Sequence, residues 1–210
     1  IKIENKTDIT LLIPEKLIFD NTFSNYSLAV YCVLRTLSQP TRLPIQCVTQ
    51  EQVEFYLTGQ LSNRRRRSDY IKCGINELVE NHIIEKNDIV QKHFILDCTN
   101  LCTNESQEHF AIITFEEVKK IFNVENTNNF LLLKYFCSLI WTISSKITVY
   151  LENGEYKNRV VGSFTIDYLS ELSGIGVRTI IEYNKILEEI GLIYVYRQED
   201  FVLDKENNIK

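Results

Sequence analysis

The stretch that decides the fold reads FTIDYLSELSGIGVRTIIEYNKILEEIGLIY, from Phe164 to Tyr194. Thr165 can cap a short helix that continues to Leu172, because a Thr hydroxyl accepts a hydrogen bond from a backbone N–H in the first turn. The glycines at positions 174 and 176 allow a tight reversal of the chain. A longer helix is predicted over 177–190, where apolar residues recur at helical spacing. The stretch therefore predicts a helix-turn-helix.

The residues after the second helix predict a β-wing. Leu192 to Arg197 have the composition of a strand, and Phe201 to Leu203 would return beside it, with residues 198–200 at the tip. A recognition helix contacts base edges and phosphates in the major groove from positions near its start. The residues predicted to contact DNA in this half of the chain are therefore Arg178, Thr179, Glu182, Lys185 and, in the wing, Arg197.

The same pattern occurs about one hundred residues earlier. Thr49 can cap a short helix that ends at Gly59, and a second helix over 68–81 precedes a β-like segment over 82–86. In each copy an extended apolar segment, at 10–18 and 110–118, precedes a long apolar helix, at 25–37 and 129–143. The sequence predicts an α+β fold, mainly α, with two tandem winged-helix domains at residues 1–102 and 103–210. The alternative is a coincidental likeness between the halves.

The first copy contains an Arg-rich insertion before its second helix. From the capping Thr to the Leu near the helix end there are 29 positions in copy one, Thr49 to Leu78, and 22 in copy two, Thr165 to Leu187. The insertion holds four consecutive arginines, which can bind backbone phosphates or enter a minor groove. Its predicted DNA-contacting residues are Arg64, Arg65, Arg66, Arg67 and, further along the helix, Lys72. The alternative is a solvated charge run.

The second copy resembles a known family. Residues 162–175 and 178–194 are similar to the winged-helix proteins of plasmids, phages and mobile elements in low-GC Gram-positive bacteria, which include replication initiators and proteins like the N-terminal domain of the DnaD primosome component. The match covers about 35 residues, and the first copy matches in outline. The resemblance implies a replication-associated protein that binds duplex DNA. Transcriptional regulators share this scaffold and remain an alternative, as does a protein-interaction or dimerisation module without DNA binding.

The charge distribution favours a focused contact with nucleic acid. The chain has 210 residues and a net charge of −5, from 23 Lys plus Arg and 28 Asp plus Glu, which excludes a uniformly cationic coat protein. Residues 1–105 carry 12 basic and 13 acidic groups, and residues 106–210 carry 11 and 15. Arg64 to Lys72 alone hold 5 basic groups against Asp69. The first copy is therefore expected to make the tighter DNA contact.

Enzymatic chemistry finds no support in the sequence. There is no His-x-His pair to hold a metal beside a Tyr nucleophile, and no G-x-x-x-x-G-K-[ST] loop for a nucleotide, so no catalytic residue and no cofactor is predicted. One group could in principle bind zinc: His93, Cys98, Cys102 and His109. Their spacing is not of the compact CxxC type, and we interpret them as strand and linker residues, with a metal site as the alternative.

The remaining expectations concern a hairpin and the surroundings of the protein. Alternating apolar residues on both sides of Asn153-Gly154 predict a β-hairpin within 146–161, which would serve as an extra ribbon at the DNA, as a dimer edge or as a loop without a role. The first residues form no apolar signal segment, and the longest apolar run, 130–141, is too short to cross a membrane. We expect a cytoplasmic protein whose partners are double-stranded DNA, host replication proteins and a second copy of itself.

Overall fold

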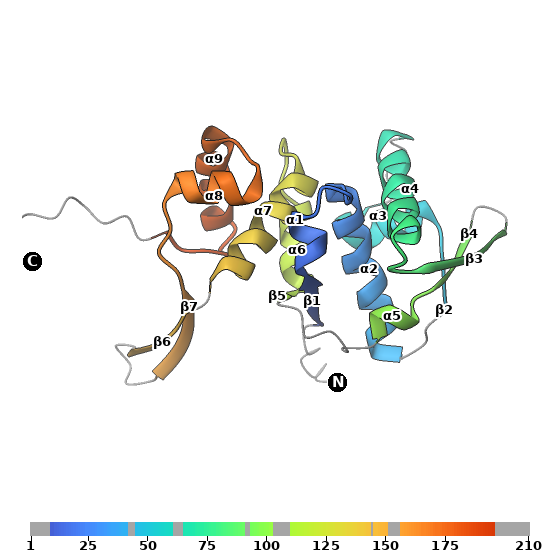
Figure 1. Ribbon diagram of the computed structural model, residues 1–210, viewed down its shortest axis with the longest axis horizontal. Helices are drawn as coiled ribbons and strands as arrows, with labels where there is room; N and C mark the ends of the chain where they lie inside the picture. Colours follow the sequence, from blue (N-terminus) through green and yellow to red (C-terminus); the bar gives the residue numbers. More distant parts are fainter. Residues whose placement is uncertain are drawn as a thin grey trace, which may run out of the picture.

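The computed structural model describes residues 9–41, 45–60, 65–90, 93–102, 110–143, 145–150 and 156–195. The fold is a mixed α+β fold, mainly helical, as expected, with small antiparallel sheets. Figure 1 shows the elements of the two sequence halves at the two ends of an elongated molecule. None of the helices in the described ranges is both long and apolar enough to span a bilayer.

A two-stranded ribbon joins the halves at the centre. Strand β1, Thr10–Pro14, pairs antiparallel with β5, Phe110–Thr114, and Leu12 lies opposite Ile112 in the middle of the pairing. These are the extended segments with which the two sequence copies begin. Alternate residues of both strands face the core, where Leu11, Ile13, Ala111 and Ile113 are at most 1% exposed. The repeat thus has a structural counterpart, because the equivalent strands pair with each other.

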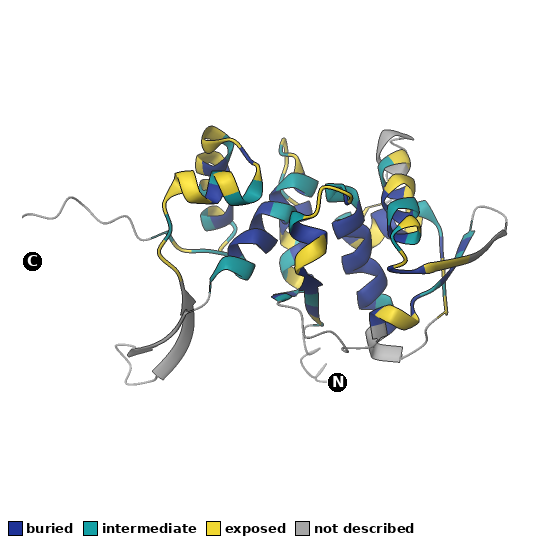
Figure 2. Ribbon diagram, in the orientation of Figure 1, coloured by how far each residue is buried: buried dark blue, intermediate teal, exposed yellow. Residues whose placement is uncertain are grey.

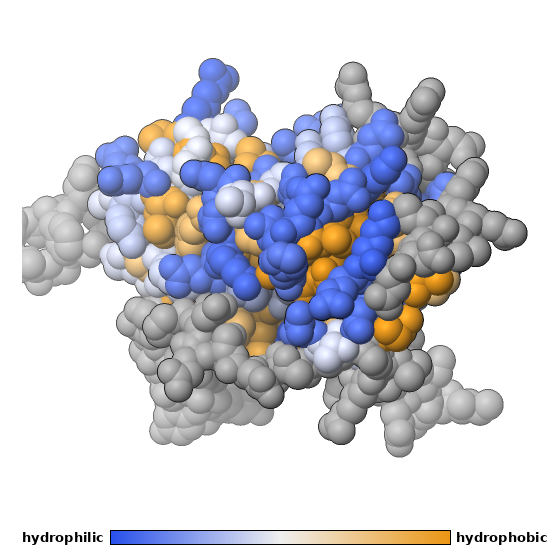
Figure 3. All heavy atoms as spheres, turned by 45° about the vertical axis from the view of Figure 1, so that its right-hand side comes forward, coloured by the Kyte–Doolittle hydropathy of each residue, from blue (hydrophilic) through white to orange (hydrophobic). Residues whose placement is uncertain are grey.

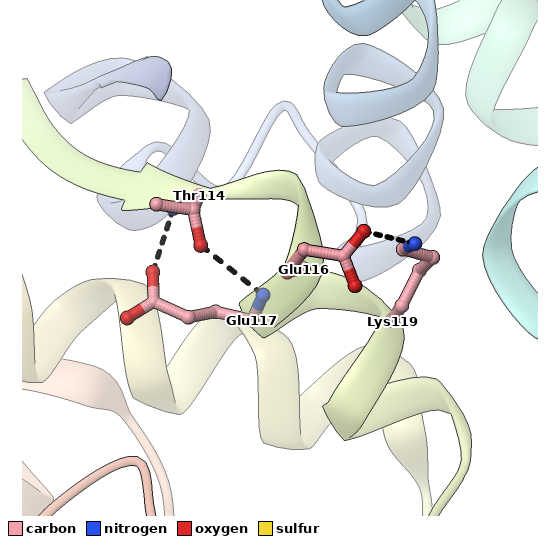
Figure 4. A network of polar contacts seen from close by, with 4 residues as sticks. All are labelled: Thr114, Glu116, Glu117 and Lys119. Carbon is pink, nitrogen blue, oxygen red and sulfur yellow. Dashed lines mark hydrogen bonds and ion pairs between the residues drawn. The ribbon is translucent and has the colours of Figure 1, made fainter. Parts of the chain in front are cut away.

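Each ribbon strand runs directly into a short helix, α1, Glu15–Phe19, or α6, Phe115–Phe122. Helix α6 begins with a capping box: Glu117 N–H donates to Thr114 Oγ1 at 3.3 Å, and Thr114 N–H donates to Glu117 Oε2 at 2.6 Å (Figure 4). Glu116 and Lys119 form an ion pair on the same helix (Figure 4). Pro14 precedes α1 and forms no side-chain cap.

The long helices α2, Asn25–Thr41, and α7, Asn129–Thr142, form the centre of one continuous hydrophobic core. Residues 28–34 of α2 are all buried, at 2% exposure or less, which requires neighbours on every side (Figure 2). Trp141 of α7 packs edge-to-face on Phe19 of α1, with ring centroids 5.0 Å apart. The core therefore extends across both sequence halves. Whether residues 1–102 and 103–210 are separate domains stays a prediction.

The first half continues with strand β2, Ile45–Val48, helix α3, Gln50–Thr58, helix α4, Arg65–Glu80, strands β3, Glu85–Val90, and β4, His93–Asp97, and a short helix α5, Thr99–Cys102. The strands form an antiparallel sheet in the order β2-β4-β3. Helix α4 begins at Arg65, three residues earlier than predicted, so that three arginines fall within its first turn. Helix α5 ends at Cys102, one of the four residues interpreted as strand and linker residues.

Helix α4 crosses α2 at very close range. A Cβ atom at Gly74 would lie 2.8 Å from the carbonyl carbon and oxygen of Tyr26, so only glycine fits at this crossing. The Glu77 carboxylate accepts from Ser24 N–H at 2.8 Å, from Ser24 Oγ at 2.7 Å and from Ser27 Oγ. Gly74 lowers the helix propensity of α4, and the close crossing explains why glycine is nevertheless present there. Glu77 fixes the orientation of α4 against the start of α2.

The second half continues with strands β6, Ser145–Tyr150, and β7, Tyr156–Val161, and helices α8, Ile166–Ser173, and α9, Val177–Glu189. Strands β6 and β7 pair antiparallel, as the predicted hairpin requires, while its turn residues Asn153 and Gly154 lie outside the described residues. The strand predicted over 192–197 is wrong in its described part, because residues 192–195 form no strand. Here the backbone turns after Gly191, and Val195 N–H donates to the Glu188 side chain at 2.9 Å instead of to a neighbouring strand.

Candidate nucleic-acid interface

The helix-turn-helix predicted in the first half corresponds to α3 and α4, and residues 61–64, which connect them, lie outside the described part of the structure. Thr49 and Gln52 form a capping box at the start of α3, with the Gln52 N–H donating to Thr49 Oγ1 at 3.1 Å. The helix ends at Gly59, whose φ of 68° lies in the left-handed region that glycine adopts without strain. Both ends of α3 were predicted from these residue types.

The arginine run lies at the start of α4. The backbone of Arg65, Arg66 and Arg67 forms the first turn of the helix, while their side chains, and Arg64 altogether, lie outside the described part of the structure. This turn is at the upper end of α4 in Figure 1, on the side opposite α5. The helix has no acidic residue in this turn. Three consecutive arginines thus occupy a helix N-terminus, whose dipole also favours anions.

The rest of α4 separates into a core side and a solvent side. Ile71, Ile75 and Leu78 are at most 1% exposed, whereas Lys72 is exposed, as its predicted contact with DNA requires. Exposed acidic residues, Asp69 and Glu80, lie on the same helix. The positive charge is therefore concentrated at the N-terminal end of α4 and does not extend along its length.

The second helix-turn-helix, of α8 and α9, has the predicted caps. Thr165 Oγ1 accepts from Tyr168 N–H at 3.1 Å, and Gly174 ends α8 with a φ of 68°. Ile175 in the turn is buried, with only 5% of its area exposed, and it belongs to the hydrophobic core on which the two helices pack. The hydroxyl of Tyr135 in α7 donates to Asn184 Oδ1 at 2.7 Å, which fixes α9 on the central helix.

The predicted DNA-contacting residues of α9 differ in their surroundings. The Arg178 side chain is 95% exposed, and its Nε lies 3.8 Å from Glu182 Oε1 one turn later. Thr179 is half-buried and Lys185 is exposed, while Arg197 lies outside the described residues. An exposed Arg at the start of the helix is accessible to a phosphate, but Glu182 partly neutralises its charge.

The solvent side of α8 and α9 is more apolar than the sequence suggested. Four large apolar side chains are between 38% and 45% exposed: Ile166, Tyr168, Val177 and Ile181. In Figure 3 hydrophobic side chains reach the surface at the left-hand end, which carries these helices. Of the two adjacent isoleucines in the predicted helix, the structure buries Ile180 completely and leaves Ile181 40% exposed.

A polar cleft adjoins the first helix-turn-helix and was not predicted. Thr58 and Gln60, at the end of α3, and residues 122–129, between α6 and α7, line a volume of about 790 Å³. The segment 123–129 reads NVENTNN, and its run of asparagines is the signal that could have identified it. The prediction relied on the spacing of apolar residues, which gives no information about a polar loop of this kind.

The His and Cys residues considered for a metal site are not grouped within the described residues. His93 begins β4 and Cys98, fully buried, follows it, while the Cys102 side chain and His109 lie outside the described part. Among the described residues no three His, Cys, Asp or Glu side chains are grouped so as to hold a metal ion. Burial raises the pKa of the Cys32 and Cys137 thiols well above the usual range, which disfavours their reactive thiolate form.

Comparison with known proteins found no match: no protein-family model, no curated protein and no solved structure is similar to this chain.

Proposed function

We propose that the chain is a winged-helix protein that binds duplex DNA in a sequence-specific manner, and that it acts in the replication of a plasmid or mobile element. In this role it binds origin sites and brings host replication proteins to them. The observation that carries the proposal is the arginine run in the first turn of α4, the second helix of a helix-turn-helix. Arginines at this place can bind phosphates while the exposed side of the helix faces the bases.

The order of elements in the first half supports the winged-helix assignment. Helix α2, strand β2, helices α3 and α4 and strands β3 and β4 follow one another, and the last two strands form a hairpin beside β2 in the order β2-β4-β3. Such a hairpin directly after the second helix of a helix-turn-helix is the feature that defines a wing. In the second half the hairpin β6–β7 comes before α8 instead of after α9, so that half supports the assignment through its helices alone.

The charge distribution supports the first half as the main DNA-binding element. Backbone phosphates dominate the affinity of most proteins for DNA, and their contribution scales with the number of Lys and Arg residues that contact them. The first turn of α4 holds three arginines, which Arg64 precedes in the sequence, whereas α9 places one exposed Arg beside Glu182. We therefore assign phosphate binding to Arg64–Arg67 and Lys72, and secondary contacts to Arg178, Thr179, Lys185 and Arg197.

Selection of bound fragments from a pool of random duplex DNA tests the proposal. We expect enrichment of a defined sequence, with a specific affinity at least about a thousandfold above that for unrelated duplex. Recovery of unrelated fragments only, at equal affinity, would contradict sequence-specific binding. An enriched sequence that recurs in the origin of the element encoding the protein supports the initiator, whereas one found in a promoter supports the alternative, a transcriptional regulator.

A second candidate function, protein binding by the second half, is favoured by one observation. Val177 and Ile181 are 41% and 40% exposed on the helix that would read DNA, where polar side chains are needed for contacts with base edges. Apolar surface surrounded by charged residues is typical of contacts between proteins. A Val177→Ser/Ile181→Ser variant that keeps its DNA affinity but loses self-association in sedimentation would assign α9 to protein binding.

A further inference from the structure

The loop between α6 and α7, residues 123–128, lies beside the helix-turn-helix of the first half. The cleft of about 790 Å³ has Thr58 and Gln60 on one side and residues 122–129 on the other. Gln60 is five positions before Arg65, where α4 begins. Figure 1 shows this loop and the N-terminal end of α4 at the same, upper side of the molecule.

Two asparagines of this segment hold the loop in its conformation. Asn129 is buried, with 7% of the residue exposed. Its side-chain Nδ2 donates to the carbonyl oxygens of Phe122 and Val124, both at 3.1 Å. Asn128 Oδ1 caps α7 by accepting from Leu131 N–H at 3.2 Å. These hydrogen bonds of Asn128 and Asn129 hold the loop at its junctions with α6 and α7.

The other asparagines present unused amides. Asn123 and Asn126 are exposed, and so is Gln60 across the cleft. The part of the chain that the structure describes provides no hydrogen-bond partner for these three side-chain amides. Asn126 has a φ of 57°, in the left-handed region that Asn adopts more readily than most other non-glycine residues. The loop thus turns sharply at an exposed asparagine.

We propose that Asn123, Asn126 and Gln60 form a second DNA contact, which recognises A·T base pairs next to the segment bound by α4. The proposal rests on the proposed function, because it places the same duplex on α4 and on the loop. Asn and Gln amides carry a donor and an acceptor side by side, which matches the adenine edge in a bidentate contact. Three such amides at the DNA-facing end of the molecule favour base recognition over simple packing.

The charges around the cleft favour contact with bases rather than phosphates. Among the described residues that line it there is no Lys or Arg, and the one charged side chain is that of Glu125, which is exposed. A carboxylate repels phosphates and so adds nothing to non-specific binding. The loop should therefore contribute to specificity, while the arginines of α4 contribute to overall affinity.

The test compares the wild type with Asn123→Ala/Asn126→Ala in binding to the sequence that the wild type selects from random duplexes. We expect about tenfold weaker binding to the selected site, since a bidentate contact contributes about 1–3 kcal/mol of discrimination. Binding to an unrelated duplex and the salt dependence should not change. A second selection with the variant should lose the A·T preference beside the α4 site.

Asn21→Ala is the control, because Asn21 is an exposed amide between α1 and α2, outside the residues that line the cleft. Circular dichroism should show the same helix content for both variants, since Asn128 and Asn129 are kept. If the double variant and the wild type have equal affinity and equal base preference, the inference about the loop is overturned and the proposed function stands. The same follows if the double variant loses affinity equally for all duplexes. If the wild type selects no sequence, the proposed function itself fails.

Discussion

Two residues of α4, Gly74 and Glu77, determine how the arginine-bearing helix sits on the core. The first permits the close approach to Tyr26, and the second binds Ser24 and Ser27 at the start of α2. One position before Gly74, the Cys73 thiol donates to Glu77 Oε1 at 3.2 Å. The position of the proposed DNA-binding end is thus set by contacts several turns away from it, along the same helix.

Gly74→Ala should destabilise the protein by about 1–2 kcal/mol. The added methyl group meets backbone atoms at 2.8 Å, and overpacking costs about 1–3 kcal/mol, of which the better helix propensity of Ala recovers up to about 1 kcal/mol. Urea denaturation provides the measurement, with Lys72→Ala on the exposed side of α4 as the control. A stability equal to or above that of the wild type would contradict the close crossing.

The Glu77 carboxylate should make stability depend on pH. Burial raises its pKa, but the hydrogen bonds from Ser27, Ser24 and Cys73 together outweigh burial, so that its pKa lies below the usual glutamate value. The stabilisation is complete above the unfolded-state pKa of about 4.3 and is lost as the pH falls from there through the lower folded-state pKa. Between pH 6 and pH 3 the denaturation midpoint should fall less steeply with decreasing pH in Glu77→Gln than in the wild type. Parallel curves for the two proteins would contradict the assignment.

At the scale of elements, short polar motifs set the helix boundaries. Thr114 and Glu117 form a reciprocal pair at the start of α6, as Thr49 and Gln52 do at α3. The turn-helix boundaries at Thr49, Gly59, Thr165 and Gly174 could be predicted from the sequence, because caps and left-handed glycines depend on local chemistry.

Thr114→Ala should reduce stability by about 1 kcal/mol, because it removes the acceptor for Glu117 N–H. Thr114→Ser is the control and should retain most of the stability, since the hydroxyl oxygen is kept. Thermal unfolding followed by circular dichroism distinguishes the two. If Ser and Ala destabilise equally, the capping hydrogen bond is not what holds α6 at this end.

Elements that depend on distant partners were harder to predict. Strand β2, which pairs with β4, was not predicted. The extended segments of β1 and β5 were predicted but their pairing was not, because pairing between distant strands leaves no local signal in the sequence. Conversely, residues 192–195 have strand composition but form no strand in the structure. For the candidate site, the charge of Arg64–Arg67 was evident in the sequence, whereas the cleft beside Gln60 arises only when α3 and α6 come together.

At the scale of the whole molecule, the two sequence halves share one core. Helices α2 and α7 and the β1–β5 ribbon join them, and the two helix-turn-helix units are at opposite ends of this centre (Figure 1). Such an arrangement keeps the units at a fixed separation, so that both could meet a single stretch of DNA. It also predicts that the halves are not independent in folding.

Unfolding should occur in one transition for both halves. Trp141, the single Trp of the chain, packs on Phe19 of the other half, so its fluorescence reports on their contact. In urea, the fluorescence transition should coincide with the loss of helix measured by circular dichroism, because coincidence of probes indicates cooperative unfolding. Two separate transitions would show that the halves unfold independently.

The salt dependence of duplex binding tests the central proposal most directly. It compares the wild type with two variants in which Arg64–Arg67 are all replaced, one by Ala and one by Lys. In a plot of log affinity against log salt, each lost phosphate contact reduces the slope by about 0.9. We predict weaker binding and a slope shallower by up to about 4 for the Ala variant, with the slope largely retained for the Lys variant. Equal affinity and equal slope for the Ala variant and the wild type would contradict DNA binding by the start of α4.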